Sequence, residues 1–196
     1  MASKKKYDVV VIGGGPAGYV AAIRCAQLGL STACIERWVN DDNKPVLGGT
    51  CLNVGCIPSK ALLDSSHHFE FLQKDCNAHG IQADATIDVT KMMTRKNKIV
   101  TGLTQGIASL LKKNKIDWLQ GSASFSDANT VIVKSISSTE EAVSASHFIV
   151  ASGSVPIELG CAKTNAEHIV DSSGALEFTT IPKRVCVIGA GVIGLE

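Results

Sequence analysis

The sequence lacks an excess of charge of either sign, because 19 lysine and arginine residues are balanced by 18 aspartate and glutamate residues. A net charge of +1 creates no field that attracts nucleic acid or an anionic membrane, so we expect neither as a partner. The apolar runs are short and rich in glycine, which argues against a membrane span. No secretory signal is visible either, because a strand-like run begins at Tyr7.

The sequence also lacks the cysteine pattern of a disulfide-stapled secreted protein, since its seven cysteines are odd in number and scattered. Cys25, Cys34 and Cys186 lie in apolar periodic segments and are predicted to be small buried side chains. Cys51 and Cys56 differ, because they lie close together in the glycine-rich stretch GGTCLNVGCIPSKALL.

The first part of the chain predicts a βαβ unit. Residues 9–12 form an unbroken apolar run typical of a strand buried in a parallel sheet, residues 16–28 predict a helix, and residues 32–35 predict a second strand. Gly13, Gly15 and Gly18 fit the G-x-G-x-x-G pattern of a dinucleotide-binding loop, which allows a tight turn and a close backbone approach to a pyrophosphate. Glu36 ends the second strand, where an acid would accept hydrogen bonds from ribose hydroxyls.

The last part of the chain repeats this pattern. Residues 184–188 predict a strand, and Gly189, Gly191 and Gly194 form a second glycine triplet before the start of a helix. The residue that would select NAD or NADP would lie past Glu196. Two such loops suggest two dinucleotides with a two-electron relay between them. Because a strand and one helical turn cannot bury their apolar faces alone, we expect the chain to be part of a longer protein.

The remaining elements are predicted from periodicity and turn residues. Residues 37–50 are predicted to be a loop and residues 155–183 mostly irregular. The predicted helices are 61–74 and 89–113, and the predicted strands are 117–122, 130–134, 141–146 and a buried strand at 148–151.

Cys51 and Cys56 can be a disulfide only if the chain between them is distorted. On a regular helix they would lie roughly 7.5 Å apart along the axis, whereas a disulfide needs Cα atoms within about 7 Å. Gly55 and Pro58 could allow that distortion. A redox pair would need an electron donor, and FAD held by the first glycine loop is a candidate. The helix that follows, together with Lys60, would favour a thiolate there.

Two other interpretations of the pair remain open. Structural zinc needs four ligands in close pairs, and neither the other cysteines nor the five histidines have that spacing, so no metal site is expected. The two thiols could also be unrelated buried side chains.

The stretch GGTCLNVGCIPSKALL resembles the active-site segment of the flavin-dependent disulfide reductases. Within that family, the sequence LNVGCIPSKAL is similar to the corresponding segment of the dihydrolipoamide dehydrogenases. FIVASGS, at residues 148–154, resembles the second flavin-contacting motif, and GAGVIGLE, at residues 189–196, resembles the NAD motif. Ser152 departs from the family, in which threonine is usual, but it keeps a hydroxyl group.

The resemblance implies roles for four catalytic residues. Cys51 would be the interchange thiol that reacts with the lipoyl sulfur, and Cys56 would be the thiol in charge-transfer contact with the flavin. Lys60 would lie near the flavin ring and pair with Glu196. The cofactor contacts implied are Gly13, Gly15, Pro16, Ala17, Gly18, Glu36, Arg37, Gly49, Thr50, Cys51, Cys56, Lys60, Gly121, Ser122, Ala123, Ser152, Gly153 and Ser154 for FAD, and Gly189, Gly191, Val192, Ile193, Gly194 and Glu196 for NAD.

The resemblance also implies a fold and a domain order. The expected fold class is α/β: a Rossmann-like FAD-binding domain with a parallel sheet, a small β-meander and helices, then the start of a Rossmann-like NAD-binding domain. The FAD-binding domain would occupy residues 1–154, a connector residues 155–183, and the start of the NAD-binding domain residues 184–196.

The implied reaction is oxidation of dihydrolipoamide, carried on a lipoyl domain of a 2-oxo acid dehydrogenase or glycine cleavage complex, with reduction of NAD. The general base would come from a C-terminal domain of the partner in a homodimer, so the chain alone is expected to be inactive. The expected location is the bacterial cytoplasm, with the mitochondrial matrix as an alternative. Two functions remain open as alternatives: reduction of another disulfide, such as glutathione or trypanothione, and a flavin-binding module without turnover.

Overall fold

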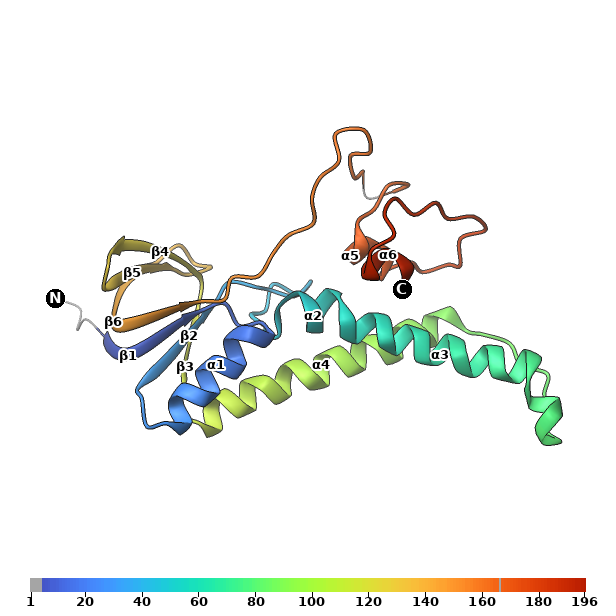
Figure 1. Cartoon of the computed structure of the whole chain (residues 1–196), viewed down its shortest axis with the longest axis horizontal. Helices are drawn as coiled ribbons and strands as arrows, with labels where there is room; N and C mark the ends of the chain where they lie inside the picture. The colour runs from blue at the N-terminus through green and yellow to red at the C-terminus, as the bar shows by residue number, and fades with distance from the viewer. Residues whose placement is uncertain (1–4, 166) are drawn as a thin grey trace. The chain divides into compact units, whose positions relative to one another are not determined.

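The computed structural model describes residues 5–165 and 167–196, so residues 1–4 of the predicted first domain lie outside it (Figure 1). The chain forms two compact units. The first comprises the chain up to Leu52 together with Gly102–Ser154, and the second comprises Asn53–Thr101 together with Val155–Glu196.

The first unit is built on one six-stranded sheet with the order β3-β2-β1-β6-β5-β4. Strands β3, β2, β1 and β6 are parallel, whereas β5 and β4 continue the sheet as an antiparallel meander. The elements are β1 (Lys5–Ile12), α1 (Pro16–Gln27), β2 (Thr32–Glu36), β3 (Asp117–Gln120), β4 (Ser122–Asp127), β5 (Thr130–Lys134) and β6 (Glu140–Val150). The predicted α/β class, with a parallel sheet and a meander, is confirmed.

The core of the first unit lies where the parallel sheet meets the meander. Apart from one tyrosine, β-branched and alanine side chains fill it, as is typical of buried strands. Its buried members are Tyr7, Val10, Ala33, Ile35, Val131, Val143, Val133 and Ala145. The register places Ile12 of β1 beside Ile35 of β2 and Val150 of β6, so the carboxyl ends of these strands lie at one edge.

The meander differs from the sequence prediction in two places. The predicted strand 117–122 is two strands, because the chain turns at Gly121 between β3 and β4. The predicted strands 141–146 and 148–151 are one strand, β6, which pairs with β5 at its start and with β1 along most of its length. The end of β6 is not buried as predicted, since Val150 is exposed.

The second unit is helical. Its main elements are α3 (Cys56–Lys74), a 3₁₀ turn (Cys76–His79), α5 (Ser172–Ala175) and α6 (Val192–Leu195). Helices α2 (Gly49–Val54) and α4 (Val89–Lys113) each continue across the boundary between the units. The predicted bounds of α4 are confirmed, and α3 begins five residues before its predicted start at Ala61.

The predicted strand at 184–188 is not formed. These residues have no strand assignment in the described part of the chain, because a strand requires a hydrogen-bonded neighbour. The glycine loop and the helix start that follow it are present. Among the described residues, the longer helices are all too polar to cross a membrane.

Candidate active site

The first glycine loop lies at the carboxyl edge of the parallel strands, where open α/β sheets bind their ligands. The N–H of Gly13 donates to the carbonyl of Ile35 at 2.8 Å, and the N–H of Ala151 donates to the carbonyl of Ile12 at 2.8 Å. A Cβ on Gly13 would lie 2.2 Å from the Ala151 oxygen. The chain that leaves β6 therefore meets this loop at Ala151 and Ser152, and Gly153 and Ser154 follow directly in the sequence.

The turn from β1 into α1 is built largely of glycine backbone. Gly15 precedes α1, whose first residue is Pro16, and no side chain caps the helix start. A Cβ on Gly18 would lie 1.7 Å from the oxygen of Gly13, so only glycine allows the helix to pack this closely. The exposed N–H groups of the first turn, including that of Ala17, are the groups that bind phosphate in dinucleotide sites.

Glu36 lies beside this loop. Its Oε2 accepts a hydrogen bond from the N–H of Gly14 at 2.6 Å, and its Oε1 accepts from the N–H groups of Arg37 and Trp38 at 2.7 and 3.0 Å. A carboxylate held at the loop by backbone donors fits the ribose end of a dinucleotide. The N–H of Gly121 donates to the Glu36 carbonyl at 2.8 Å, which brings the turn that leads to Ser122 and Ala123 to the same edge.

The backbone of Gly48 and Gly49 packs directly against the first glycine loop. The N–H of Gly48 donates to the carbonyl of Gly14 at 2.8 Å. Gly49 has a φ of +58°, and a Cβ there would lie 2.7 Å from the Cα of Gly15. Gly49 and Thr50 therefore begin the cysteine-bearing helix α2 directly at the glycine loop.

Cys51 and Cys56 lie on two successive helices. Cys51 is in the middle of α2 and is partly buried, and Cys56 is the first residue of α3 and is exposed. Gly55 between the helices has φ −141° and ψ −122°, so the regular helix is interrupted there. The predicted distortion between the cysteines is confirmed. The disulfide between the two sulfurs stays a prediction.

Lys60 and Glu196 form an ion pair within the second unit, which confirms the contact expected from the resemblance. Ser59 donates to the same Glu196 oxygen, Oε1, at 3.1 Å. The hydrogen bond from Lys60 is the main cause that lowers the pKa of Glu196, and the Ser59 hydroxyl lowers it further. The helix that carries Cys56 is thereby joined to the end of the second glycine loop.

The second glycine loop has the backbone geometry of the first. Gly189 has a φ of +110°, compared with +111° for Gly13. Gly191 precedes α6 in the same extended conformation as Gly15, and Val192 and Ile193 begin the helix. A Cβ on Gly194 would lie 2.2 Å from the Gly189 oxygen, so the third glycine again allows close packing.

These features match one family of proteins over nearly the whole chain. The sequence profile described as "Pyridine nucleotide-disulphide oxidoreductase" matches residues 7–196. The chain belongs to this family.

Individual relatives agree with the family assignment. The chain is 48% identical to dihydrolipoyl dehydrogenase 3 of Pseudomonas putida over 193 residues, which cover 98% of this chain and 40% of that protein. It is 49% identical to dihydrolipoyl dehydrogenase of Trypanosoma brucei brucei, over 97% of this chain and 39% of that protein. It is 48% identical to leghemoglobin reductase of Vigna unguiculata, over 96% of this chain and 35% of that protein. The chain thus spans about two fifths of the length of these family members.

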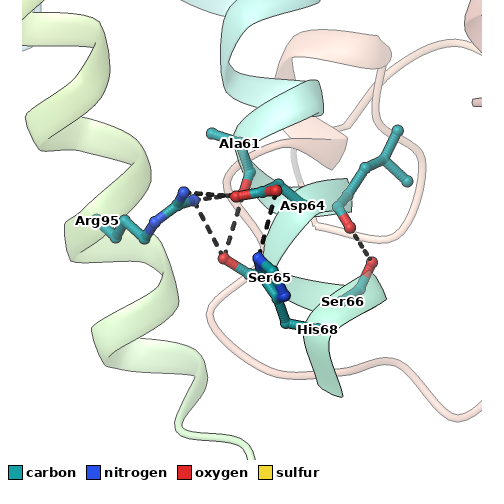
Figure 2. A network of polar contacts seen from close by, with 7 residues as sticks. Ala61, Asp64, Ser65, Ser66, His68 and Arg95 are labelled. Carbon is teal, nitrogen blue, oxygen red and sulfur yellow. Dashed lines mark hydrogen bonds and ion pairs between the residues drawn. The ribbon is translucent and has the colours of Figure 1, made fainter. Parts of the chain in front are cut away.

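The present chain also has a polar contact between α3 and α4 that was not predicted from its sequence (Figure 2). Arg95 of α4 donates to Asp64 Oδ2 at 2.6 Å, to the carbonyl of Ala61 at 2.9 Å and to Ser65 Oγ at 3.2 Å. His68 lies 3.6 Å from the other oxygen of Asp64. These partners lie 30 to 34 residues from Arg95 in the chain, so no local sequence pattern predicts the contact.

The other cysteines divide by burial. Cys34 lies on β2 with its sulfur 3.7 Å from the oxygen of Gly13, and burial, followed by the charge of Glu36, raises its pKa to about 12. Its predicted burial is confirmed. Cys25 is only partly buried, and the prediction for Cys186 is wrong, because its segment has no strand neighbour to cover it. No group of three or more metal-binding side chains occurs among the described residues.

Proposed function

We propose that the chain is the flavin-binding part, followed by the start of the nicotinamide-binding part, of a dihydrolipoamide dehydrogenase. The observation that carries the proposal is the Lys60–Glu196 ion pair, because it joins the helix that begins at Cys56 to the end of the second glycine loop. The division into residues 1–154, 155–183 and 184–196 belongs to this proposal. So do a homodimer and a location in the bacterial cytoplasm or mitochondrial matrix.

The residues present fit both cofactors. The loop of Gly13, Gly15 and Gly18, whose backbone packs too closely at Gly13 and Gly18 for a Cβ, would hold the pyrophosphate of FAD, and Glu36 would hold its ribose. Gly189, Gly191 and Gly194 would hold the pyrophosphate of NAD. FAD, when bound, supplies the two-electron acceptor that lies between a dithiol and a nicotinamide.

The proposed chemistry of this chain is thiol–disulfide exchange at Cys51 and Cys56. In the oxidised protein the two sulfurs are bonded, and one thiolate of dihydrolipoamide attacks Cys51 while Cys56 leaves as a thiolate. The second substrate thiol then displaces Cys51, so lipoamide is released and both protein sulfurs are reduced. The two protons of the substrate dithiol would leave by way of a general base on a later domain of the partner subunit. The two electrons of the Cys51–Cys56 dithiol and one proton would pass to the bound cofactors, which gives NADH and restores the disulfide, and the second proton would be released.

The test is an anaerobic titration of the whole protein with dithionite. We expect it to take up more electrons than its flavin needs, with a long-wavelength absorbance band at the two-electron stage. Cys56→Ser should abolish the band, whereas Cys161→Ser, at an exposed site on another segment, should leave it unchanged. Uptake limited to the flavin would instead indicate a flavin-binding module. Faster turnover with oxidised glutathione than with dihydrolipoamide would identify a different member of the family.

A further inference from the structure

Lys96 is a buried charged residue that the proposed chemistry does not use. Only 1% of its side chain is exposed, although it lies on α4 among exposed neighbours. Its Nζ donates to Glu177 Oε1 at 2.5 Å and to the carbonyl of Leu176 at 2.9 Å. Lysine is almost never fully buried unless its charge is paired, so this placement calls for an explanation.

The two partners of Lys96 lie at the C-terminal end of α5. Leu176 is the residue that follows the helix, and the Lys96 ammonium group donates to its carbonyl, which has no partner within the helix. The start of α5 is closed by Asp171, whose carboxylate accepts from the N–H of Gly174 at 2.9 Å. Polar contacts therefore hold both ends of this single helical turn, and the described residues around it, 155–165 and 176–183, are largely irregular.

Stability alone does not account for a lysine at this position. Removing the charge of Lys96 from water is costly, so its burial is not explained by stability alone. Its contacts with the Leu176 carbonyl and with Glu177, which is 56% exposed, instead favour one position of α5 on α4.

That position is connected to the proposed active site by contacts within the second unit. Arg95, next to Lys96, joins α4 to α3 through Asp64. On α3, Lys60 and Ser59 contact Glu196, at the end of the segment that α5 begins. The segment from α5 to Glu196 is thus held at both ends, by Lys96 at one end and by Lys60 at the other.

We propose that Lys96 is a positioning residue for the nicotinamide half of the reaction. By fixing α5 on α4 it holds the second glycine loop where Glu196 can contact Lys60. The inference rests on the proposed function, but it predicts a separate effect. Substitution of Lys96 should change the reduction of NAD and leave the reaction with the substrate dithiol unchanged.

The test compares Lys96→Met with Lys98→Met in the whole protein. Lys98 is an exposed lysine on the same helix and serves as the matched control. For Lys96→Met we expect unchanged flavin content, unchanged reduction by dihydrolipoamide, and a KM for NAD raised roughly tenfold, the effect of one lost hydrogen bond to a charged group. Hydrogen exchange should accelerate at residues 172–177 and at the amides of Leu195 and Glu196. Lys98→Met should change none of these.

Glu177→Gln provides a second variant if Lys96→Met does not fold. Glu177 is 56% exposed, so its amide can remain hydrated, and we expect a smaller change of the same kind. An unchanged KM for NAD, or equal slowing of both half-reactions, would overturn the role of Lys96. If the unsubstituted protein does not reduce NAD with dihydrolipoamide, the proposed function fails. Exchange at Leu195 and Glu196 then decides whether Lys96 holds the loop, and unchanged exchange overturns it.

Discussion

Among single residues, Tyr7 carries the clearest pH dependence in the first unit. It is 8% exposed, and its hydroxyl donates to Asp117 Oδ2 at 2.6 Å, which ties the start of β1 to the start of β3. Burial, and then the hydrogen bond and charge of Asp117, raise the pKa of Tyr7 well above its ordinary value. A raised pKa in the folded state means that the contribution to stability is complete below the unfolded value, about 10, and declines as the pH rises above it.

Tyr7→Phe is expected to lower the free energy of unfolding by about 1–2 kcal/mol at pH 7, because it removes a hydrogen bond to a charged group. The difference between the two proteins should shrink above about pH 10, where the unfolded tyrosine ionises. Urea unfolding at several pH values measures both effects. Tyr19→Phe, on α1, is the control for the loss of a tyrosine hydroxyl elsewhere in the first unit. A difference that stays constant with pH would contradict the assigned role of the hydroxyl.

The residues that sequence reasoning found and missed differ in how far away their partners lie. Gly13, Gly18 and Glu36 were predicted because a glycine loop between a strand and a helix is a local pattern. Lys96 could not be predicted, since its partner Glu177 is 81 residues away and lies in a segment without a recognisable pattern. Ser59 adjoins the predicted Lys60, yet only the structure brings its hydroxyl to Glu196.

Between elements, the Arg95 contact fixes α3 beside α4. Arg95 and Asp64 are about half exposed, so solvent weakens their ion pair. Arg95 also donates to a backbone carbonyl and a serine hydroxyl of α3, and these hydrogen bonds fix the orientation of its guanidinium group. We expect Arg95→Met to destabilise the protein by about 1 kcal/mol, with a coupling of about 0.5–1 kcal/mol to Asp64→Asn in a double-mutant cycle.

The measurement is urea unfolding at low and high salt. Screening should reduce the coupling at 1 M salt, since the pair is exposed. Lys98→Met, on the same helix, should change stability by no more than a surface substitution does, within about 0.5 kcal/mol. A coupling near zero at low salt would show that Arg95 and Asp64 act independently.

Element bounds were predictable where periodicity is local and continuous, as in α4, whose helical pattern runs from Val89 to Lys113. Element bounds were not predictable where they depend on which strands pair with one another. The sequence predicts a short strand at 141–146 and a separate buried strand at 148–151, yet residues 140–150 form one strand because β1 lies beside most of it. Residues 184–188 have a strand pattern, but no described neighbour pairs with them.

At the scale of the whole molecule, the chain divides into units that the order of residues does not reveal. Each unit combines two segments that lie apart in the sequence. The sequence did indicate that the glycine pattern occurs twice, and the structure gives both copies the same backbone geometry, one in each unit. If each copy serves its own dinucleotide, then the two binding functions can be removed separately.

Gly18→Ala and Gly194→Ala test this separation in the whole protein. The added Cβ would lie 1.7 Å from the Gly13 oxygen in the first variant and 2.2 Å from the Gly189 oxygen in the second, so each helix start must move away from its loop. Gly18→Ala is expected to lose flavin. Gly194→Ala is expected to keep flavin and its reduction by dihydrolipoamide, but to bind NADH at least about tenfold more weakly, since a loop that must shift loses phosphate hydrogen bonds.

Gly102→Ala is the matched control, because a Cβ there meets nothing within 4 Å and the residue lies inside α4. Removing a glycine from a helix interior should stabilise the protein by about 0.5–1 kcal/mol and leave both cofactors bound. Flavin absorbance after purification and NADH titration distinguish the three variants. If Gly194→Ala loses flavin as well, the two loops do not act as separate sites, and the assignment of one dinucleotide to each glycine loop is wrong.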